Sequence, residues 1–268
     1  MEQQYLLALE GGGTRSQAAL MDFSGRVLES AEGGDVNTNF TSYDQALKNI
    51  RAVVEQVLSK TGVNGRAVAL FVSALVGPKF GEETFGSLCP NARFVYYRER
   101  DVIFARAGIY RPHGVGLVAA TGATAFGVRA DDGRETFAGG WGALLGDEGS
   151  AYAMGLLGLR AAARAYEGRL GCPTRLVEAL CQHLQLDPAQ FRRDLVHLAY
   201  HKPLSRAEIA GLAGLVTRLA DEGDSAASKI CEKVARDLAG LGLHAARQLF
   251  DPAETFDDVA AGGLVNAG

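Results

Sequence analysis

The sequence lacks the features that mark nucleic-acid-binding and membrane-spanning proteins. It has 27 Lys and Arg against 31 Asp and Glu among 268 residues, and no basic run is longer than two residues. Nucleic-acid binders need a basic patch that displaces counterions from phosphates. No apolar stretch approaches the roughly 20 residues that span a bilayer, and the N-terminus has no signal-peptide pattern. We therefore expect a cytoplasmic protein that binds neither nucleic acid nor a membrane.

Cysteine is also scarce, which argues against disulfide and metal-cluster frameworks. The four cysteines form no CxxC pair and have no metal-ligand spacing, so we expect free thiols in a reducing compartment. His197 and His201 are spaced to share one helix face, but no HExxH pattern surrounds them and no carboxylate is suitably placed as a third ligand. We expect a solvated or locally bonded histidine pair in preference to a zinc site.

Two stretches of the chain repeat one pattern of short apolar runs and glycine turns. The runs lie at residues 5–9, 17–23 and from 27 in the first stretch, and at 114–119, 125–128 and from 136 in the second. Each set reads as a meander of three strands. Gly25 and Gly133 stand in corresponding turns 108 positions apart, and at that offset Thr14 falls on Gly122. A duplicated unit of this kind predicts two α/β domains that face each other across a ligand cleft.

Helical patterns follow each meander. Ser42 begins a capping-box signal, and apolar residues continue at helical spacing until Gly62. Further strands are expected at 67–72 and 94–97, with a short helix at 102–107. Residues 151–250 are almost entirely helical in pattern, and Val259 to Gly263 reads as a strand that enters a glycine turn. We expect an N-terminal domain over residues 1–111 and a C-terminal domain with a helical insertion over 112–268.

The stretch from Gly139 to Tyr152 is the strongest local signal. It holds five glycines and the adjacent carboxylates of Asp147 and Glu148, directly before an Ala-rich helical pattern. Glycine at this density is kept where the backbone takes φ > 0 or where another group approaches it closely. The acidic pair lies where a helix would begin, so a polar ligand could bind there. A plain helix N-cap at Asp147 explains the local pattern equally well.

The two glycine turns suit the phosphates of a nucleotide, because backbone N–H groups in tight turns form anion-binding concavities. The Walker A spacing and a G-x-G-x-x-G turn are both absent. Several motifs together resemble the N-acetylglucosamine kinases of the BadF/BadG ATPase family: Leu9-Glu10-Gly-Gly-Gly-Thr14-Arg15-Ser16, Asn37, Asp101, Thr121-Gly122, and Gly-Gly-Trp141-Gly to Gly-Asp147-Glu148-Gly-Ser150-Ala-Tyr152. The resemblance covers nearly the whole chain in order. It implies the actin-like ATPase fold, in which two ribonuclease-H-like domains flank a nucleotide cleft.

The resemblance also implies a role for each matching residue. Asp101 matches the catalytic base, and Glu10 matches the acid that holds Mg²⁺ through water. The positions that match ATP-binding residues are Gly11, Gly12, Gly13, Thr14, Thr121, Gly122, Ala210, Gly262 and Gly263. The positions that match sugar-binding residues are Asn37, Asp101, Ala123, Thr124, Gly140, Trp141, Gly142 and Asp147. We therefore expect an ATP- and Mg²⁺-dependent kinase that phosphorylates the 6-hydroxyl of N-acetylglucosamine, and a homodimer.

The chemistry of these residue types fits those roles, although ordinary structural explanations exist for some of them. Phosphoryl transfer needs in-line placement, groups that spread phosphate charge, and a carboxylate that accepts the hydroxyl proton. Asp101 could instead be the N-cap of a helix that starts at Val102. Glu10 could be a polar strand end, and Trp141 could simply pack in the core.

The chain departs from the family pattern at three places. The second phosphate turn has Ala120-Thr121-Gly122-Ala123 where Gly-Thr-Gly-Ser is usual, Arg100 precedes the proposed base, and the segment from Ser73 to Gly77 is poorer in glycine. The substrate alternatives are glucosamine and N-acetylmuramic acid. Two further alternatives are an electron-transfer activator, for which no cysteine lies beside the second turn, and a sensor that binds ATP or sugar without turnover. Family members continue past the last glycine turn, so we expect the native chain to extend beyond these residues or its tail to be disordered.

Overall fold

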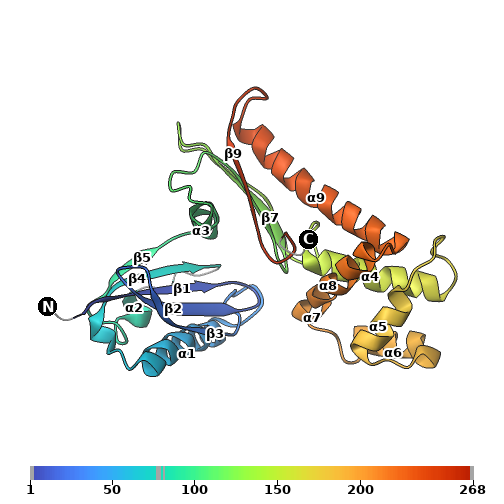
Figure 1. Ribbon diagram of the computed structural model, residues 1–268, viewed down its shortest axis with the longest axis horizontal. Coiled ribbons are helices and arrows are strands. Elements are labelled where there is room, and N and C mark those ends of the chain that lie inside the picture. The colour runs from blue at the N-terminus through green and yellow to red at the C-terminus, as the bar shows by residue number, and fades with distance from the viewer. Residues whose placement is uncertain (1–2, 77–79, 81, 266–268) are drawn as a thin grey trace. The chain divides into compact units, whose positions relative to one another are not determined.

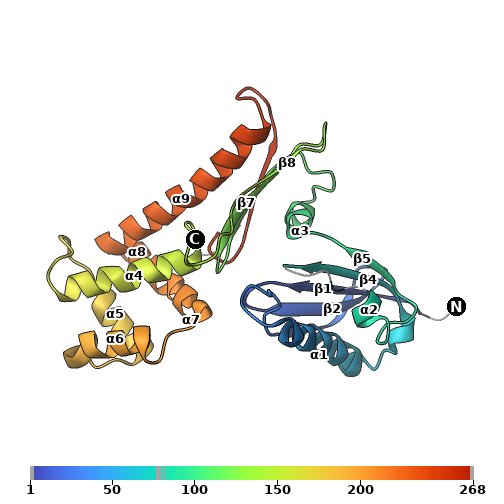
Figure 2. The ribbon, with the colours of Figure 1, turned by 180° about the vertical axis from the view of Figure 1, so that it is seen from behind.

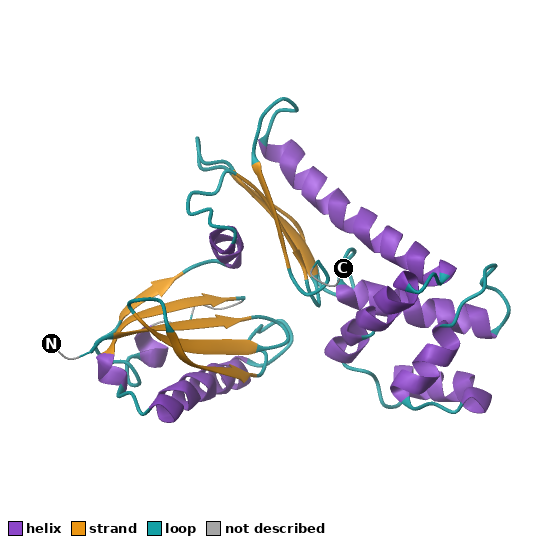
Figure 3. Cartoon of the chain, in the orientation of Figure 1, coloured by secondary structure: helices purple, strands orange, loops and turns teal. Residues whose placement is uncertain are grey.

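The structure is a computed structural model that describes residues 3–76, 80 and 82–265. The chain divides into two compact units, Met1–Arg106 and Ala107–Gly268. Each unit contains one β-sheet with helices packed on it (Figure 1; Figure 3). This division lies directly after a short helix, whereas the sequence pattern placed the boundary a few residues later, at Tyr110-Arg111-Pro112.

The sheet of the first unit has five strands in the order β3-β2-β1-β4-β5. The strands are β1 (Tyr5–Gly11), β2 (Ser16–Asp22), β3 (Val27–Gly33), β4 (Val68–Leu75) and β5 (Arg93–Tyr96). The first three form the predicted antiparallel meander, while β4 pairs with β1 in parallel and β5 pairs with β4 in parallel. The carboxyl ends of β1, β4 and β5 therefore lie at one edge of the sheet, which is where ligands bind in sheets of this kind.

Helix α1 (Tyr43–Thr61) packs along β2 and β3 (Figure 1). It begins and ends where the sequence predicts, since the Ser42 hydroxyl accepts the Gln45 N–H at 3.2 Å and Gly62 has φ 67°. The Gln45 side-chain amide nitrogen donates along the helix to Asn49 Oδ1 at 2.8 Å. The remaining helical segments of this unit are η1 (Gly65–Ala67), α2 (Glu82–Phe85) and α3 (Glu99–Arg106).

The sheet of the second unit has four strands in the order β8-β7-β6-β9. The strands are β6 (Gly114–Ala119), β7 (Ala123–Val128), β8 (Glu135–Gly139) and β9 (Asp257–Ala261). The first three again form an antiparallel meander, and β9 pairs with β6 in parallel. The predicted repeat of strands is thus confirmed at the level of topology. Gly25 and Gly133, whose spacing indicated the repeat in the sequence, both lie in turns and both have positive φ.

The helices of the second unit stand between β8 and β9 in the chain, as the pattern over 151–250 predicts. They are α4 (Ala151–Tyr166), α5 (Leu176–Leu184), η2 (Pro188–Gln190), α6 (Phe191–Tyr200), α7 (Arg206–Gly211), α8 (Ala213–Asp221) and α9 (Ser225–Leu249). Helix α9 runs along the sheet and packs on β6, β7 and β8 (Figure 2). Helices α4, α5, α6 and α8 share a separate apolar core with the first half of α9.

Two expectations about composition can be checked against the structure. No helix within the described ranges is long and apolar enough to cross a membrane. All four cysteines are free thiols, as predicted: Cys89, Cys172, Cys181 and Cys231. Cys89 is fully buried, and its burial raises the pKa of the thiol to about 11. A thiol with this pKa stays protonated and unreactive near neutral pH.

Candidate functional site

The first glycine turn joins β1 to β2 and is held by its neighbours through backbone hydrogen bonds. The Gly12 N–H donates to the Arg15 carbonyl at 2.9 Å, Val36 N–H donates to the Gly12 carbonyl at 3.0 Å, and Val76 N–H donates to the Gly11 carbonyl at 2.9 Å. A Cβ on Gly11 would lie 2.6 Å from a Val36 methyl. Glycine at position 11 is therefore required for close packing, and its φ is not in the left-handed region.

Asn37 lies beside this turn, because the N–H of the preceding residue, Val36, is hydrogen-bonded to the Gly12 carbonyl. Its side chain is 8% exposed, and its Oδ1 accepts the Asn39 N–H at 3.0 Å. Its carbonyl accepts the N–H groups of Phe40 and Thr41 at 2.9 and 3.1 Å. The structure thus brings Asn37 and Gly12 together within the first unit, with the Asn37 side chain fixed by its own turn.

Asp101 lies in the first turn of α3 and is not the N-cap of a helix that starts at Val102. Its Oδ2 accepts the Arg98 N–H at 3.0 Å, and its Oδ1 is 3.4 Å from Arg100 Nε. The helix begins two residues before Asp101, so the carboxylate reaches back to the helix start as the third residue of a capping box does. Its side chain is 32% exposed and so stays accessible to a ligand.

Glu99, which sequence reasoning missed, lies near Glu10 in the first unit. Burial of the Glu99 carboxyl raises its pKa above the ordinary glutamate value, and the negative charge of Glu10 raises it further. Glu10 is an exposed residue near the end of β1, and Glu99 is half-buried at the start of α3. Two acids that repel each other at a strand end form a region where a cation would be stabilised.

The second glycine turn joins β6 to β7 and lies against the N-terminus of α4. The N–H groups of Ala151 and Tyr152 donate to the carbonyls of Ala120 and Thr121 at 2.9 and 3.3 Å. The turn is therefore anchored by donors of the first helical turn. Its own closing bond runs from the Ala120 N–H to the Gly122 carbonyl at 2.9 Å.

The glycine-rich stretch from Gly139 to Tyr152 adopts the backbone that its composition predicts. Four of its glycines have positive φ: Gly139, Gly140, Gly142 and Gly149. Asp147 also has positive φ, at 63°, which is uncommon for a residue with a Cβ. The N-cap of α4 is Ser150, whose hydroxyl accepts the Ala153 N–H at 3.0 Å. The explanation of Asp147 as a plain N-cap is therefore wrong.

Asp147 is instead a buried carboxylate at the second turn. It is 2% exposed, and its Oδ1 accepts the Ala123 N–H at 3.3 Å. Its Oδ2 forms an ion pair and hydrogen bond with Arg206 at the start of α7. A Cβ on Gly122 would lie 2.9 Å from both Asp147 Oδ1 and Arg206 Nη2. Sequence reasoning missed Arg206, although Ser205-x-x-Glu208 is a readable capping box directly around it.

Several other predicted residues of the second unit lie at the same end of its sheet, whereas Ala210 is a buried residue of α7. The Gly140 N–H donates to the Ala123 carbonyl at 2.9 Å, and Thr124 Oγ1 donates to the Ala138 carbonyl at 3.1 Å. The Trp141 side chain is 73% exposed and is not part of a core. A Cβ on Gly262 would overlap the Ala119 carbonyl oxygen, so the turn after β9 packs directly on the end of β6.

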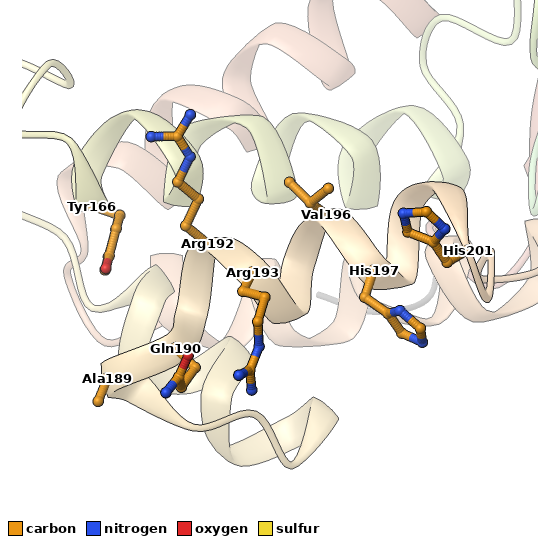
Figure 4. Close-up of a pocket in the computed structure, with 8 residues that line it drawn as sticks. All are labelled: Tyr166, Ala189, Gln190, Arg192, Arg193, Val196, His197 and His201. Atoms are coloured by element: carbon orange, nitrogen blue, oxygen red, sulfur yellow. The ribbon is translucent and has the colours of Figure 1, made fainter.

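Two other polar clusters lie elsewhere in the second unit. A surface groove of about 660 Å³ lies beside α6. Figure 4 shows the residues that line it, with Arg193 and His197 extending to one side of the helix. His197 and His201 stack with ring centroids 5.5 Å apart, and none of the predicted site residues lines this groove. His113, Asp131 and Glu254 could share a metal ion, but Arg129 lies 2.7 Å from Glu254 and 3.8 Å from Asp131. This arginine already supplies the positive charge there.

Comparison with known proteins identifies the family. The profile of the BadF/BadG/BcrA/BcrD ATPase family matches residues 9–267. The chain belongs to this family. The match confirms the resemblance drawn from the glycine turns and from the block around Asp147, both of which lie inside the matched range.

Two curated relatives are sugar kinases by name. The N-acetylmuramic acid/N-acetylglucosamine kinase of Clostridium acetobutylicum is 24% identical, over 88% of this chain and 77% of the relative. The N-acetyl-D-glucosamine kinase of Dictyostelium discoideum is 26% identical, over 99% of this chain and 86% of the relative.

Solved structures share the fold of this family member. A Chromobacterium violaceum protein with the proposed name N-acetylglucosamine kinase superposes with a TM-score of 0.74 at 23% identity, over 99% of this chain and 89% of that one. A ROK-family glucokinase of Streptomyces griseus, solved with glucose and AMPPNP, superposes with a TM-score of 0.60 at 17% identity, over 98% of this chain and 85% of that one. The predicted α/β fold of the actin-like ATPase type is thereby confirmed.

Proposed function

We propose that this family member is an ATP-dependent hexosamine kinase that transfers the γ-phosphate of ATP to the 6-hydroxyl of N-acetylglucosamine. The observation that carries the proposal is the hydrogen bond from the Ala123 N–H to Asp147. It joins the second phosphate turn directly to the sugar-binding block. A kinase needs this adjacency, because the acceptor hydroxyl must lie about 3 Å from the phosphorus that it attacks. The names of both curated relatives agree with this substrate.

In this proposal the second unit binds the sugar and part of the nucleotide. Asp147 accepts hydrogen bonds from sugar hydroxyls, Thr124 and the backbone of Gly140 to Gly142 complete the polar lining, and exposed Trp141 offers an aromatic face. Thr121 and Gly122 contact phosphate through backbone N–H groups. Ala210 on α7 and the Gly262-Gly263 turn form the adenosine side.

The first unit contributes the base and the first phosphate turn. Asp101 accepts the proton of the 6-hydroxyl while the hydroxyl oxygen bonds to the γ-phosphorus and the bond to the ADP oxygen breaks. The Arg98 N–H and Arg100 hold the carboxylate in one orientation before the substrate arrives. Gly11 to Thr14 receive phosphate oxygens, and Asn37 contacts the sugar.

The residues around Glu10 fit a hydrated Mg²⁺ ion. Oxygen atoms are the ligands that this ion prefers, and the carboxyl of Glu99, whose pKa is raised by burial first and by the charge of Glu10 second, lies close enough to Glu10 to feel its charge. Glu10 would hold the ion through water, and the bound ion would withdraw charge from the phosphate oxygens. Glu10 and Glu99 keep a negative region at the end of β1, which sets where the triphosphate binds.

A substrate panel tests the proposal. Purified protein is incubated with ATP, Mg²⁺ and one of N-acetylglucosamine, glucosamine, N-acetylmuramic acid or glucose, and ADP release and product mass are recorded. We expect the highest kcat/KM for N-acetylglucosamine. N-acetylmuramic acid is the second candidate, because the Clostridium acetobutylicum relative is named for both sugars. No phosphorylated product from any hexosamine at millimolar concentration would contradict a kinase and favour a binding-only sensor.

Location and assembly are part of the same proposal. We place the protein in the cytoplasm, where ATP is abundant and free thiols such as its four cysteines stay reduced. We also propose a homodimer, which sedimentation equilibrium at micromolar concentration tests. A mass of 28.3 kDa in solution would correspond to the monomer and contradict it.

A further inference from the structure

The position of Arg206 is fixed by the local structure of α7 and by the packing of that helix. Ser205 Oγ accepts the Glu208 N–H at 3.2 Å, and the Glu208 carboxylate accepts the Ser205 N–H at 2.7 Å. This capping box fixes the backbone on both sides of Arg206. A Cβ on Gly155 would overlap the Ile209 carbonyl oxygen, so only glycine lets α4 and α7 approach this closely. Helix α7 is therefore held against the helix whose N-terminus anchors the second turn.

The guanidinium of Arg206 reaches from α7 to Asp147 and to the second turn. It pairs with the buried carboxylate of Asp147 and lies within 2.9 Å of the site where a Cβ on Gly122 would be. The Arg206 side chain is 21% exposed, so both partners of the pair are largely removed from water. Charge-assisted hydrogen bonds of this kind are short, strong and directional.

We propose that Arg206 is a positioning residue that fixes the Asp147 carboxylate at the second phosphate turn for sugar binding. The inference rests on the proposed function. Asp147 Oδ1 is bonded to Ala123 and its Oδ2 to Arg206, so both oxygens have set directions. Each oxygen has further acceptor capacity, which the sugar hydroxyls use. The planar fork of arginine defines the carboxylate plane in a way that the point charge of lysine cannot.

The test compares Arg206→Gln and Arg206→Lys with Arg218→Gln, which changes an exposed arginine on neighbouring α8. The protein has a single tryptophan, Trp141, in the proposed sugar site. Its fluorescence therefore reports sugar binding independently of turnover. We expect Arg206→Gln to raise the Kd and KM for N-acetylglucosamine about tenfold or more, with kcat and the KM for ATP within about threefold. Arg206→Lys should lie in between, and Arg218→Gln should match the wild type.

A double-mutant cycle separates positioning from a merely structural role. Removing one partner of a buried pair can unfold a protein, so the cycle uses the milder Arg206→Lys together with Asp147→Asn. If Arg206 acts through Asp147, Arg206→Lys should raise the sugar Kd in the wild type but leave it unchanged in the Asp147→Asn background. Effects that multiply independently would overturn the inference.

The remaining outcomes are equally decisive. A rise in the KM for ATP with an unchanged sugar Kd would mean that Arg206 binds phosphate directly, and the positioning role would be wrong. If the wild type binds hexosamine and the Arg206 variants bind it with the same Kd, this inference is wrong and the proposed function stands. A wild type that neither binds nor phosphorylates any hexosamine overturns the proposed function and this inference with it.

Discussion

The two glycine turns stand at the same place in two similar sheets, yet they are built differently. In each unit the last residue of the first strand accepts a hydrogen bond from the segment after the parallel strand: Gly11 from Val76 at 2.9 Å, and Ala119 from Leu264 at 3.1 Å. The connection from β1 to β2 has four residues between the strands, whereas that from β6 to β7 has three. Counted from the ends of β1 and β6, Thr14 therefore aligns with Gly122, as the repeat offset gives, whereas counted back from the starts of β2 and β7 it aligns with Thr121.

The difference in surroundings indicates a division of labour. The first turn is packed by small apolar contacts at Gly11 and lies at the sheet edge that carries Glu10 and its neighbour Glu99. The second turn has no acid of its own and receives the Asp147–Arg206 pair from the following helical region. In the proposed function, the first unit would offer negative charge for a cation, and the second a neutralised, directional carboxylate.

The largest effect is expected at Asp101. Asp101→Asn keeps an acceptor for the Arg98 N–H but removes the base, so kcat should fall about 10²-fold or more while the Kd for N-acetylglucosamine changes little. Steady-state kinetics and Trp141 fluorescence measure the two quantities. Asp44→Asn, an exposed acid in the first turn of α1, serves as the control. A variant within a few-fold of the wild-type kcat would remove Asp101 from the mechanism.

Alanine substitutions in the two turns should act on different quantities. Gly122→Ala pushes against the Asp147–Arg206 pair, because its Cβ would lie 2.9 Å from both side chains. We expect it to raise the sugar KM about tenfold and to destabilise the protein by about 1–3 kcal/mol. Gly12→Ala has no neighbour closer than 4.0 Å, so it should leave thermal stability unchanged and raise only the KM for ATP. Equal effects on sugar and ATP in both variants would erase the distinction between the turns.

A stability pair tests how the second unit holds its carboxylate. Gly155→Ala places a Cβ against the Ile209 backbone and forces α7 away from α4, which should cost about 1–3 kcal/mol and lower the melting temperature by several degrees. Gly240→Ala in α9 has open space around the new methyl and should be neutral or stabilising by about 0.5–1 kcal/mol. Urea denaturation measures both. Similar gains in the two variants would show that helix propensity, and not the contact with Ile209, decides the effect.

The smallest effect is expected at Glu99, through pH. Its pKa is raised in the folded protein, by burial first and by Glu10 second. The stability that this group contributes is therefore fully present below the unfolded glutamate pKa and is lost as pH rises through the folded pKa. Glu99→Gln should gain stability relative to the wild type as pH increases from 4 to 8, measured by thermal melts in EDTA. Glu83→Gln, an exposed acid on α2, should show no such trend. A constant difference across pH would contradict a raised pKa of Glu99 in the folded protein.

Much of the fold could be predicted because its signals are local. Strand periodicity and turn glycines placed both meanders, and Ser42 and Gly62 marked the ends of α1. The helical pattern expected over residues 151–250 corresponds to the helices α4 to α9 of the second unit. The glycines around Asp147 were correctly attributed to a special backbone, since positive φ is a property of single residues.

The pairing of distant charges could not be predicted from the sequence. Arg206 and Asp147 are 59 positions apart, and they meet only because Gly155 lets α7 pack on α4. The approach of Glu99 to Glu10 depends likewise on the course of the chain after β5. The site roles of Asp101, Asn37 and the turn residues stay predictions. Gly77, at the end of the segment that differs from the family pattern, lies outside the described residues.

The measurement that tests the account most directly is the position of the phosphate on the product. Wild-type protein is incubated with ATP, Mg²⁺ and N-acetylglucosamine, and the product is examined by proton-coupled phosphorus NMR. The account predicts one sugar phosphomonoester whose phosphorus couples to the two protons on carbon 6, formed in equal amount with ADP. Phosphate on another hydroxyl would contradict the proposed acceptor, and inorganic phosphate alone would show that ATP is hydrolysed without transfer to the sugar.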